Sequence, residues 1–165
     1  MSTRDGGERL TGVELGAWRG LLRVHSSLIH ELDADLLAAH GLSLHSYEVL
    51  LLLEDAPGRR LRMTDLSRSA LLSASGVSRL VDRLEGDGYV KRMPCPSDGR
   101  GSYAALTQAG LAKLREARAT HLDGVRRLFL RHFDGEGLRR LAEAWERVLP
   151  GAVEDGRHPD RGGRP

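Results

Sequence analysis

Apolar residues recur at helical spacing near the start of the chain. From about Val13 to His40 they return every three or four positions without an interrupting proline, and Gly41 supplies a C-terminal stop. The predicted helix of about 28 residues is longer than most globular helices, and such a helix in a small protein often packs against a partner subunit. Its apolar stripe comprises Trp18, Leu21, Leu22, His25, Leu28, Ile29, Leu32 and Leu36.

Three shorter helices are predicted in the middle of the chain. Ser43 caps the first, Pro57-Gly58 ends it, and the segment RRLRM that follows is predicted to be extended. Thr64 caps a brief second helix, and Ser73 caps the third. The predicted buried positions are Leu44, Tyr47, Leu50, Leu51 and Leu53 in the first, Leu66, Ala70 and Leu71 in the second, and Val77, Leu80, Val81 and Leu84 in the third.

The hydrophobic period then changes towards that of extended chain. Residues 89–94 and 102–106 are predicted strands, joined by the turn-rich segment CPSDGRG into one β-hairpin with a long, charged tip. Thr107 caps another long helix, and Asp134 caps a last one that Pro150-Gly151 stops. The apolar positions of these helices are Leu111, Leu114, Val125, Leu128 and Phe129, and then Leu138, Leu141, Trp145 and Leu149.

These elements predict a mainly α protein with a small β-hairpin wing, in which a winged helix-turn-helix is flanked by long dimerisation helices. Two of the short helices are joined by Leu72-Ser73-Ala74, the spacing of a helix-turn-helix, and the hairpin that follows makes it a winged variant. We expect a disordered N-terminal tail at 1–12, an N-terminal dimerisation helix at 13–41, the winged DNA-binding domain at 42–107, C-terminal dimerisation helices at 108–150 and a disordered tail at 151–165.

Composition excludes several classes of protein. With 165 residues, of which 40% are apolar and 29% charged, the chain has the composition of one globular domain. A single cysteine excludes an internal disulfide and a cysteine-rich zinc finger. No apolar run approaches the roughly 18 residues of a membrane span, and the first residues lack the apolar stretch of a signal peptide. We therefore expect no membrane partner and a cytoplasmic, nucleoid-associated protein.

Positive charge is concentrated in the middle of the chain. Residues 59–107 hold nine arginine and lysine residues against five acidic ones, although the whole chain carries only +2. The helix that follows Ser73 can bring its N-terminus to a phosphate, and its arginines can contact phosphates or guanine edges. A solvated amphipathic face is the alternative, and the hairpin with Arg100 at its tip favours DNA. The exposed face of this helix presents Ser75, Gly76, Ser78, Arg79, Asp82 and Arg83.

These residues resemble the winged helix-turn-helix core of the MarR family, the multiple-antibiotic-resistance regulators. The resemblance runs from Leu42 to Leu114 through LSLHSYEVLLLL, SASGVSRLVDRLEGDGYVKR and SDGRGSYAALTQAG. The family's wing pattern, Asp-x-Arg followed by Leu-Thr-x-x-Gly, is present as Asp98-Gly99-Arg100 and Leu106-Thr107-Gln108-Ala109-Gly110. The long flanking helices also fit, so the resemblance covers nearly the whole chain apart from its two ends.

The resemblance implies a sequence-specific transcription regulator, expected to be a repressor, that binds a pseudo-palindromic operator of double-stranded DNA as a homodimer. The first helix and the last two helices of each subunit would interlace, and each recognition helix would enter a major groove. Arg100 would enter the flanking minor groove, Asp98 would orient Arg100, and Arg83 would contact phosphate or form a salt bridge. The candidate DNA-binding residues are Ser73, Ser75, Gly76, Ser78, Arg79, Arg83, Asp98 and Arg100.

The family resemblance also implies a small, phenolic or anionic effector bound between the dimer helices and the DNA-binding domain. Its occupation would shift the distance between recognition helices. A tryptophan on the first helix resembles the urate-responsive branch, whose other ligand residues have no match here. Packing of Trp18 and His25 in a dimer interface is the alternative. The candidate lining is Trp18, Arg19, His25, Tyr47 and Arg92.

Cys95 gives a different regulatory hypothesis. It lies in the predicted wing between two prolines, beside Lys91 and Arg92, which could lower the pKa of its thiol. Its oxidation would move Arg100 and make the protein a redox-responsive regulator, whereas the alternative is an unreactive loop thiol.

Catalytic and metal-binding motifs are not found in the sequence. It contains no glycine-rich phosphate loop, G-x-S-x-G elbow or HExxH, so we expect no enzyme and no cofactor. His25 and His30 are five positions apart, as are His40 and His45, which is not the spacing of two metal ligands on one helical face. A helical dimeric adaptor without DNA binding is a further alternative, against which the arginine in the basic hairpin argues.

Overall fold

The computed structural model describes residues 9–70 and 73–153, with Asp98 and Arg100 described by their backbone alone. The predicted core residue Leu71, the linker residue Leu72 and most of both predicted tails therefore lie outside the described residues. In chain order the helices and strands are α1 (Gly12–His40), α2 (Leu44–Asp55), a 3-10 turn (Pro57–Arg59), β1 (Arg60–Arg62), α3 (Met63–Ser69), α4 (Ala74–Gly86), β2 (Val90–Cys95), β3 (Asp98–Leu106), α5 (Gln108–Leu128), a second 3-10 turn (Leu130–His132) and α6 (Gly135–Val148).

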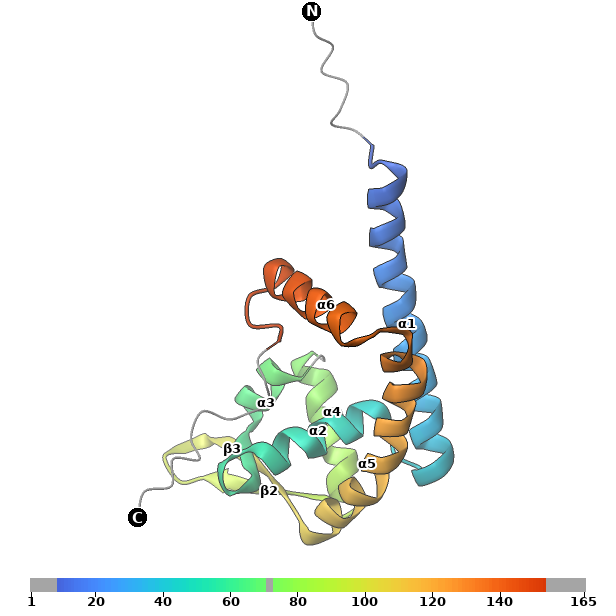
Figure 1. Ribbon diagram of the computed structural model, residues 1–165. Coiled ribbons are helices and arrows are strands. Elements are labelled where there is room, and N and C mark those ends of the chain that lie inside the picture. Colours follow the sequence, from blue (N-terminus) through green and yellow to red (C-terminus); the bar gives the residue numbers. More distant parts are fainter. Residues whose placement is uncertain (1–8, 71–72, 154–165) are drawn as a thin grey trace, which may run out of the picture.

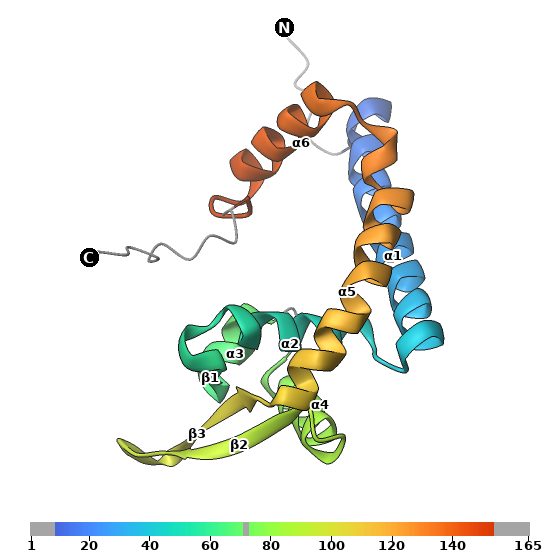
Figure 2. The ribbon, with the colours of Figure 1, turned by 60° about the horizontal axis from the view of Figure 1, so that its bottom comes forward.

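The helices and strands form two parts. Helices α1 and α5 lie side by side as a long arm, and α2, α3, α4 and the sheet form a compact module at one end of it (Figures 1 and 2). The two arm helices approach closely at Gly124 of α5, where an added Cβ would lie only 2.7 Å from Leu32 Cδ2 of α1. Helix α6 extends from the end of the arm opposite to the module and lies apart from it (Figure 2). The predicted fold, mainly helical with a small winged sheet, is confirmed.

The module is held by an apolar core to which all its helices contribute. The predicted stripe of α4 is confirmed, with Val77, Leu80, Val81 and Leu84 at most 5% exposed. Burying side chains of this size stabilises the fold by about 1.5–3 kcal/mol each. The largest fully buried side chains are Leu36, Leu44, Leu50, Leu53, Leu66, Leu84, Leu114, Val49, Val77, Val81 and Val90.

Local capping explains most helix boundaries. Thr11 and Glu14 form a capping box that starts α1 one residue earlier than predicted, and Gly41 ends it in the left-handed conformation at φ 63°. The predicted N-caps Ser43, Ser73, Thr107 and Asp134 are confirmed, each accepting a hydrogen bond from a backbone N–H three residues later.

The predicted cap at Thr64 is wrong. Helix α3 starts at Met63 with Arg62 at the N-cap position and no side-chain capping bond. The reason is tertiary: Arg62 pairs with Tyr103 in the sheet, which holds it in an extended conformation, so that the helix begins directly where the strand ends.

The sheet corrects the predicted hairpin tip. Its strand order is β1-β3-β2, and the expected extended segment RRLRM supplies β1. Strand β3 begins at Asp98, so the turn contains only Pro96 and Ser97 rather than the seven residues predicted. A register shift at Pro94/Cys95 accommodates residues 99–101, because Pro94 pairs with Ser102 whereas Cys95 pairs with Asp98. Arg100 therefore lies within β3 and not at the tip.

In the described part of the chain, no single helix is long and apolar enough to cross a membrane; α1 and α2 satisfy that test only together, and they are bent by 83°.

Candidate nucleic-acid interface

Helix α4 exposes a polar face opposite its buried stripe. Ser73, Ser75, Arg79 and Arg83 are exposed, and Gly76 and Ser78 are half-buried. Ser73 accepts a hydrogen bond from Gly76 N at 3.2 Å, which orders the first turn. The fold thus brings the six candidate residues predicted on this helix onto a single short element.

Arg79 and Arg83 lie one helical turn apart on that face. Neither makes a hydrogen bond or an ion pair with another residue that the structure describes. A guanidinium without an internal partner keeps its donors for an external acceptor such as a phosphate or a base edge. The helix therefore presents two cations beyond its small, polar N-terminal turn, Arg79 in its middle and Arg83 in its last turn.

The wing extends away from the helices beside α4 (Figure 2). Its turn is tied to β1, since Arg62 Nη2 donates to Ser97 Oγ at 3.1 Å and Arg62 Nε to Tyr103 Oη at 3.4 Å. The guanidiniums of Arg60 and Arg62 lie 5.3 and 5.8 Å from the centre of the Tyr103 ring. These supporting residues were missed in the sequence, although the basic segment RRLRM could have indicated them. The predicted contact of Asp98 with Arg100 concerns side chains outside the described part.

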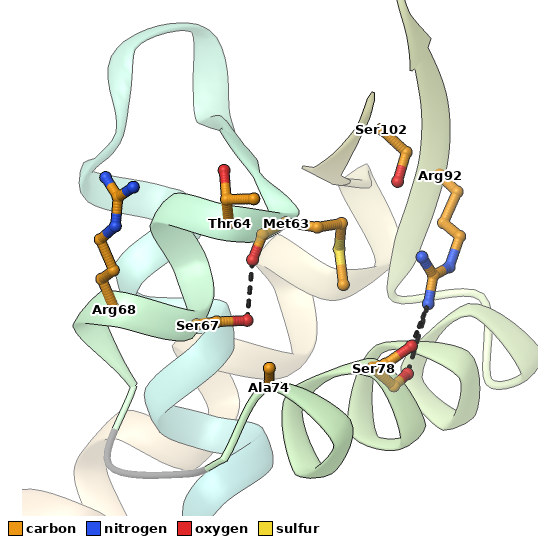
Figure 3. A pocket seen from close by; sticks show the side chains of 8 residues that line it. All are labelled: Met63, Thr64, Ser67, Arg68, Ala74, Ser78, Arg92 and Ser102. Carbon is orange, nitrogen blue, oxygen red and sulfur yellow. Dashed lines mark hydrogen bonds between the residues drawn. The ribbon is translucent and has the colours of Figure 1, made fainter. Parts of the chain in front are cut away.

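A hollow of about 450 Å³ lies between α3, α4 and the sheet (Figure 3). On one side, Arg92 extends from β2 towards Ser78 of α4. On the other, Ser67 Oγ donates to Met63 O at 2.9 Å. Sequence patterns gave no signal for the α3 residues of this lining, because they carry no motif. The lining residues are Met63, Thr64, Ser67, Arg68, Ala74, Ser78, Arg92 and Ser102.

Comparison with known proteins agrees with this geometry. A sequence profile of the MarR family matches residues 40–101. AbsC, a MarR family transcriptional regulator from Streptomyces coelicolor, is 37% identical over 86% of this chain and 95% of its own, with a TM-score of 0.80. The chain belongs to the MarR family. It is a transcription regulator by that relationship, as the sequence resemblance predicted.

Two further MarR-type relatives are similar over much of the chain. Sco3205, a MarR family transcriptional regulator from Streptomyces coelicolor whose structure was solved in complex with DNA, is 35% identical over 92% of this chain and 95% of its own, with a TM-score of 0.83. The HTH-type transcriptional repressor YetL of Bacillus subtilis (strain 168) is 29% identical over 67% of this chain and 68% of its own.

The five candidate ligand residues of this MarR-family protein do not meet in one place. His25 lines a second hollow, of about 410 Å³, between α1 and α2, whereas Arg92 lines the first. Trp18 and Arg19 are exposed nearer the start of α1. The second hollow is lined by His25, Ser26, Ile29, His30, Asp33, Leu44 and His45.

Tyr47 belongs to the contact between α2 and α5 and not to either hollow. It is 2% exposed, and its ring centre lies 4.5 Å from that of His121. Burial raises the pKa of Tyr47, which Arg118 partly offsets, and burial lowers the pKa of His121. Arg118 also pairs with Glu54 of α2. This cluster joins the arm to the module through polar groups that sequence spacing did not reveal.

Cys95 is buried in the MarR wing, at 5% exposure. Hydrogen bonding to Ser97 lowers the pKa of its thiol, and the positive charge of Arg62 adds to this. The predicted lowering of this pKa is confirmed, but its causes are Ser97 and Arg62, whereas Arg92 turns towards α4 and pairs with Asp82. No group of three or more His, Cys, Asp or Glu residues among those described could hold a metal ion.

Proposed function

We propose that this MarR-family regulator binds a pseudo-palindromic operator as a homodimer and represses transcription. The observation that carries the proposal is the exposed face of α4, which presents Arg79 and Arg83 on the helix beside which the wing extends. Ser73, Ser75, Gly76 and Ser78 would allow close approach of the helix to a major groove, and Arg100 would reach the adjacent minor groove. The solved DNA complex of Sco3205 supports this use of the fold.

The homodimer is supported by apolar side chains that the single chain leaves uncovered. Trp18 and Leu22 of α1 are 54% and 50% exposed, and Leu149 after α6 is 64% exposed. Helix α6 has no buried residue, although its apolar positions recur at helical spacing. Exposed apolar surface of this extent marks an interface. A second copy interlaced through α1, α5 and α6 would cover the exposed apolar residues of α1 and α6.

Substitution of Leu22 by glutamate is expected to dissociate the dimer, raising its dissociation constant at least about tenfold, because a charge would be buried without a partner. Sedimentation velocity at micromolar concentration measures the change. Ser27→Glu on the opposite face of the same helix is the matched control and should remain dimeric. Equal dissociation in both variants, or in neither, would count against this interface.

The proposed function is tested by selecting bound duplexes from random-sequence DNA and titrating the winning sequence by fluorescence anisotropy with non-specific competitor. We expect a pseudo-palindrome with half-sites about one helical turn apart. Failure to enrich any sequence would contradict the proposal.

Operator affinity is also expected to fall steeply with salt. Each phosphate contact contributes about 0.9 to the negative slope of log K against log salt concentration, so several contacts per dimer give a slope of about −4 or steeper. Anisotropy titrations between low and physiological salt measure it. A flat response would show that the basic face does not neutralise phosphates.

We propose further that a small phenolic or anionic compound modulates DNA affinity from the hollow between α1 and α2. The hollow joins the arm to the module, and His25, His30 and His45 line it. An occupant that fits one arrangement of arm and module better than the other would shift the population between them. Adding a ligand should then raise the melting temperature and change operator affinity together.

A further inference from the structure

One wing residue makes all the polar contacts that join β2 to α4 in the described part of the chain. Arg92 N donates to Glu85 Oε1 at 2.8 Å, and Arg92 Nη2 donates to Asp82 Oδ1 at 2.6 Å. The same nitrogen lies 3.3 Å from both the carbonyl oxygen and the hydroxyl of Ser78 (Figure 3). A single arginine thus spans two turns of the recognition helix.

The bonds of Arg92 to α4 fix the orientation of its guanidinium group. The Arg92 side chain is 28% exposed, whereas those of Asp82 and Glu85 are 61% and 41% exposed. A guanidinium is a planar fork, so bonds to a carboxylate and to a helix carbonyl at once fix its orientation. The strand from which it extends pairs with β3, the strand that contains Arg100. A change in the position of Arg92 would therefore tilt the wing relative to α4.

We propose that Arg92 is a positioning residue that sets the wing at the angle needed for α4 and Arg100 to enter their grooves together, and that Asp82 supports DNA binding through it. The proposal rests on the proposed DNA-binding function. It assigns a favourable role to an acidic residue on the DNA-facing helix, where simple charge repulsion from phosphate predicts the opposite.

The direction in which operator affinity changes when Asp82 is replaced separates the positioning role from simple charge repulsion. Asp82→Ala is expected to weaken binding to the selected operator about threefold to tenfold, because the 2.6 Å ion pair that orients Arg92 is lost. Asp87→Ala at the C-cap of the same helix removes the same charge without touching Arg92 and is expected to leave affinity unchanged or slightly tighter. Equal tightening in both variants would overturn the proposal.

The energetic coupling between Arg92 and Arg100 in operator binding gives a second test. Arg92→Ala should weaken binding about tenfold in the native background but less than twofold when Arg100 is already alanine, because the positioned group is then absent. Fully additive losses would show that Arg92 contacts DNA itself and would overturn the positioning role. Lys91→Ala, which removes a neighbouring exposed cation, controls for net charge.

The contacts of Arg92 with α4 hold β2 against this helix and are called the clamp. Amide hydrogen exchange without DNA tests the clamp independently of the proposed function. Asp82→Ala should speed exchange in β2 and β3 while leaving α2 and the melting temperature unchanged. Unaltered exchange in the wing would overturn the clamp even if the native protein binds its operator. Faster exchange in a protein that selects no DNA would instead refute the proposed function and leave the clamp standing.

Discussion

Replacing Arg100 by alanine is expected to weaken operator binding about tenfold to hundredfold, since a groove contact of an arginine is worth about 1–3 kcal/mol. The backbone places Arg100 in β3, between the paired residues Asp98 and Ser102 where the register shifts. A narrow A·T-rich minor groove has a strong negative potential that attracts such a side chain. The loss should therefore be larger on operators with A·T-rich flanks than on operators with G·C-rich flanks.

The same substitution should leave the fold and the dimer intact. Melting temperature and sedimentation coefficient are expected to match those of the native protein, because Gly99 and the residues of the turn are exposed. Arg126→Ala removes an equal charge from an exposed site on α5 and serves as the matched control. Unchanged operator affinity of Arg100→Ala, or a lost dimer, would refute the assigned role of the wing.

Replacing Gly110 by alanine is expected to destabilise the protein by about 3 kcal/mol or more, the upper range for overpacking. An added Cβ would lie 2.1 Å from Tyr89 O and 2.9 Å from Leu106 Cδ1. The Tyr89 carbonyl cannot easily withdraw, because it accepts a bond from Thr107 N at 3.1 Å. Thr107 Oγ1 in turn donates to Gly88 O at 2.7 Å. This junction supplies a physical reason for the glycine that ends the wing pattern.

Urea denaturation measures this effect. Gly20→Ala is the matched control, since Gly20 is also helical and an added Cβ would meet nothing within 4 Å. It should stabilise the protein by about 0.5–1 kcal/mol through helix propensity. If Gly110→Ala behaved like Gly20→Ala, the close approach of α5 to the Tyr89 carbonyl would be incorrect.

Sequence patterns succeeded where one local signal decides a structure. The caps at Ser43, Ser73, Thr107 and Asp134 depend on a side chain and a backbone N–H three residues apart, so that nearby residues suffice. The buried stripe of α4 follows in the same way from spacing. The two wing motifs were sufficient to place the chain in its family before any contact was known.

Errors arose where a distant strand determined local structure. Thr64 has the chemistry of a cap, but pairing of Arg62 with Tyr103, 41 residues away, starts α3 before it. The segment CPSDGRG has turn composition, yet pairing with β2 draws Asp98 to Leu106 into one strand. Sheet register depends on both partners, and one strand's composition does not specify it.

The sequence by itself determined the helical architecture, the winged module and the family. It also determined which residues of α4 face away from the core of the module. Each of these depends on short-range spacing. The tertiary structure alone decided which of those residues can act together. It separated the five candidate ligand residues between two hollows, the exposed start of α1 and the buried contact of α2 with α5. It also turned Arg92 towards Asp82 and away from Cys95, because side-chain direction in a strand follows from its pairing and packing rather than from its neighbours in the chain.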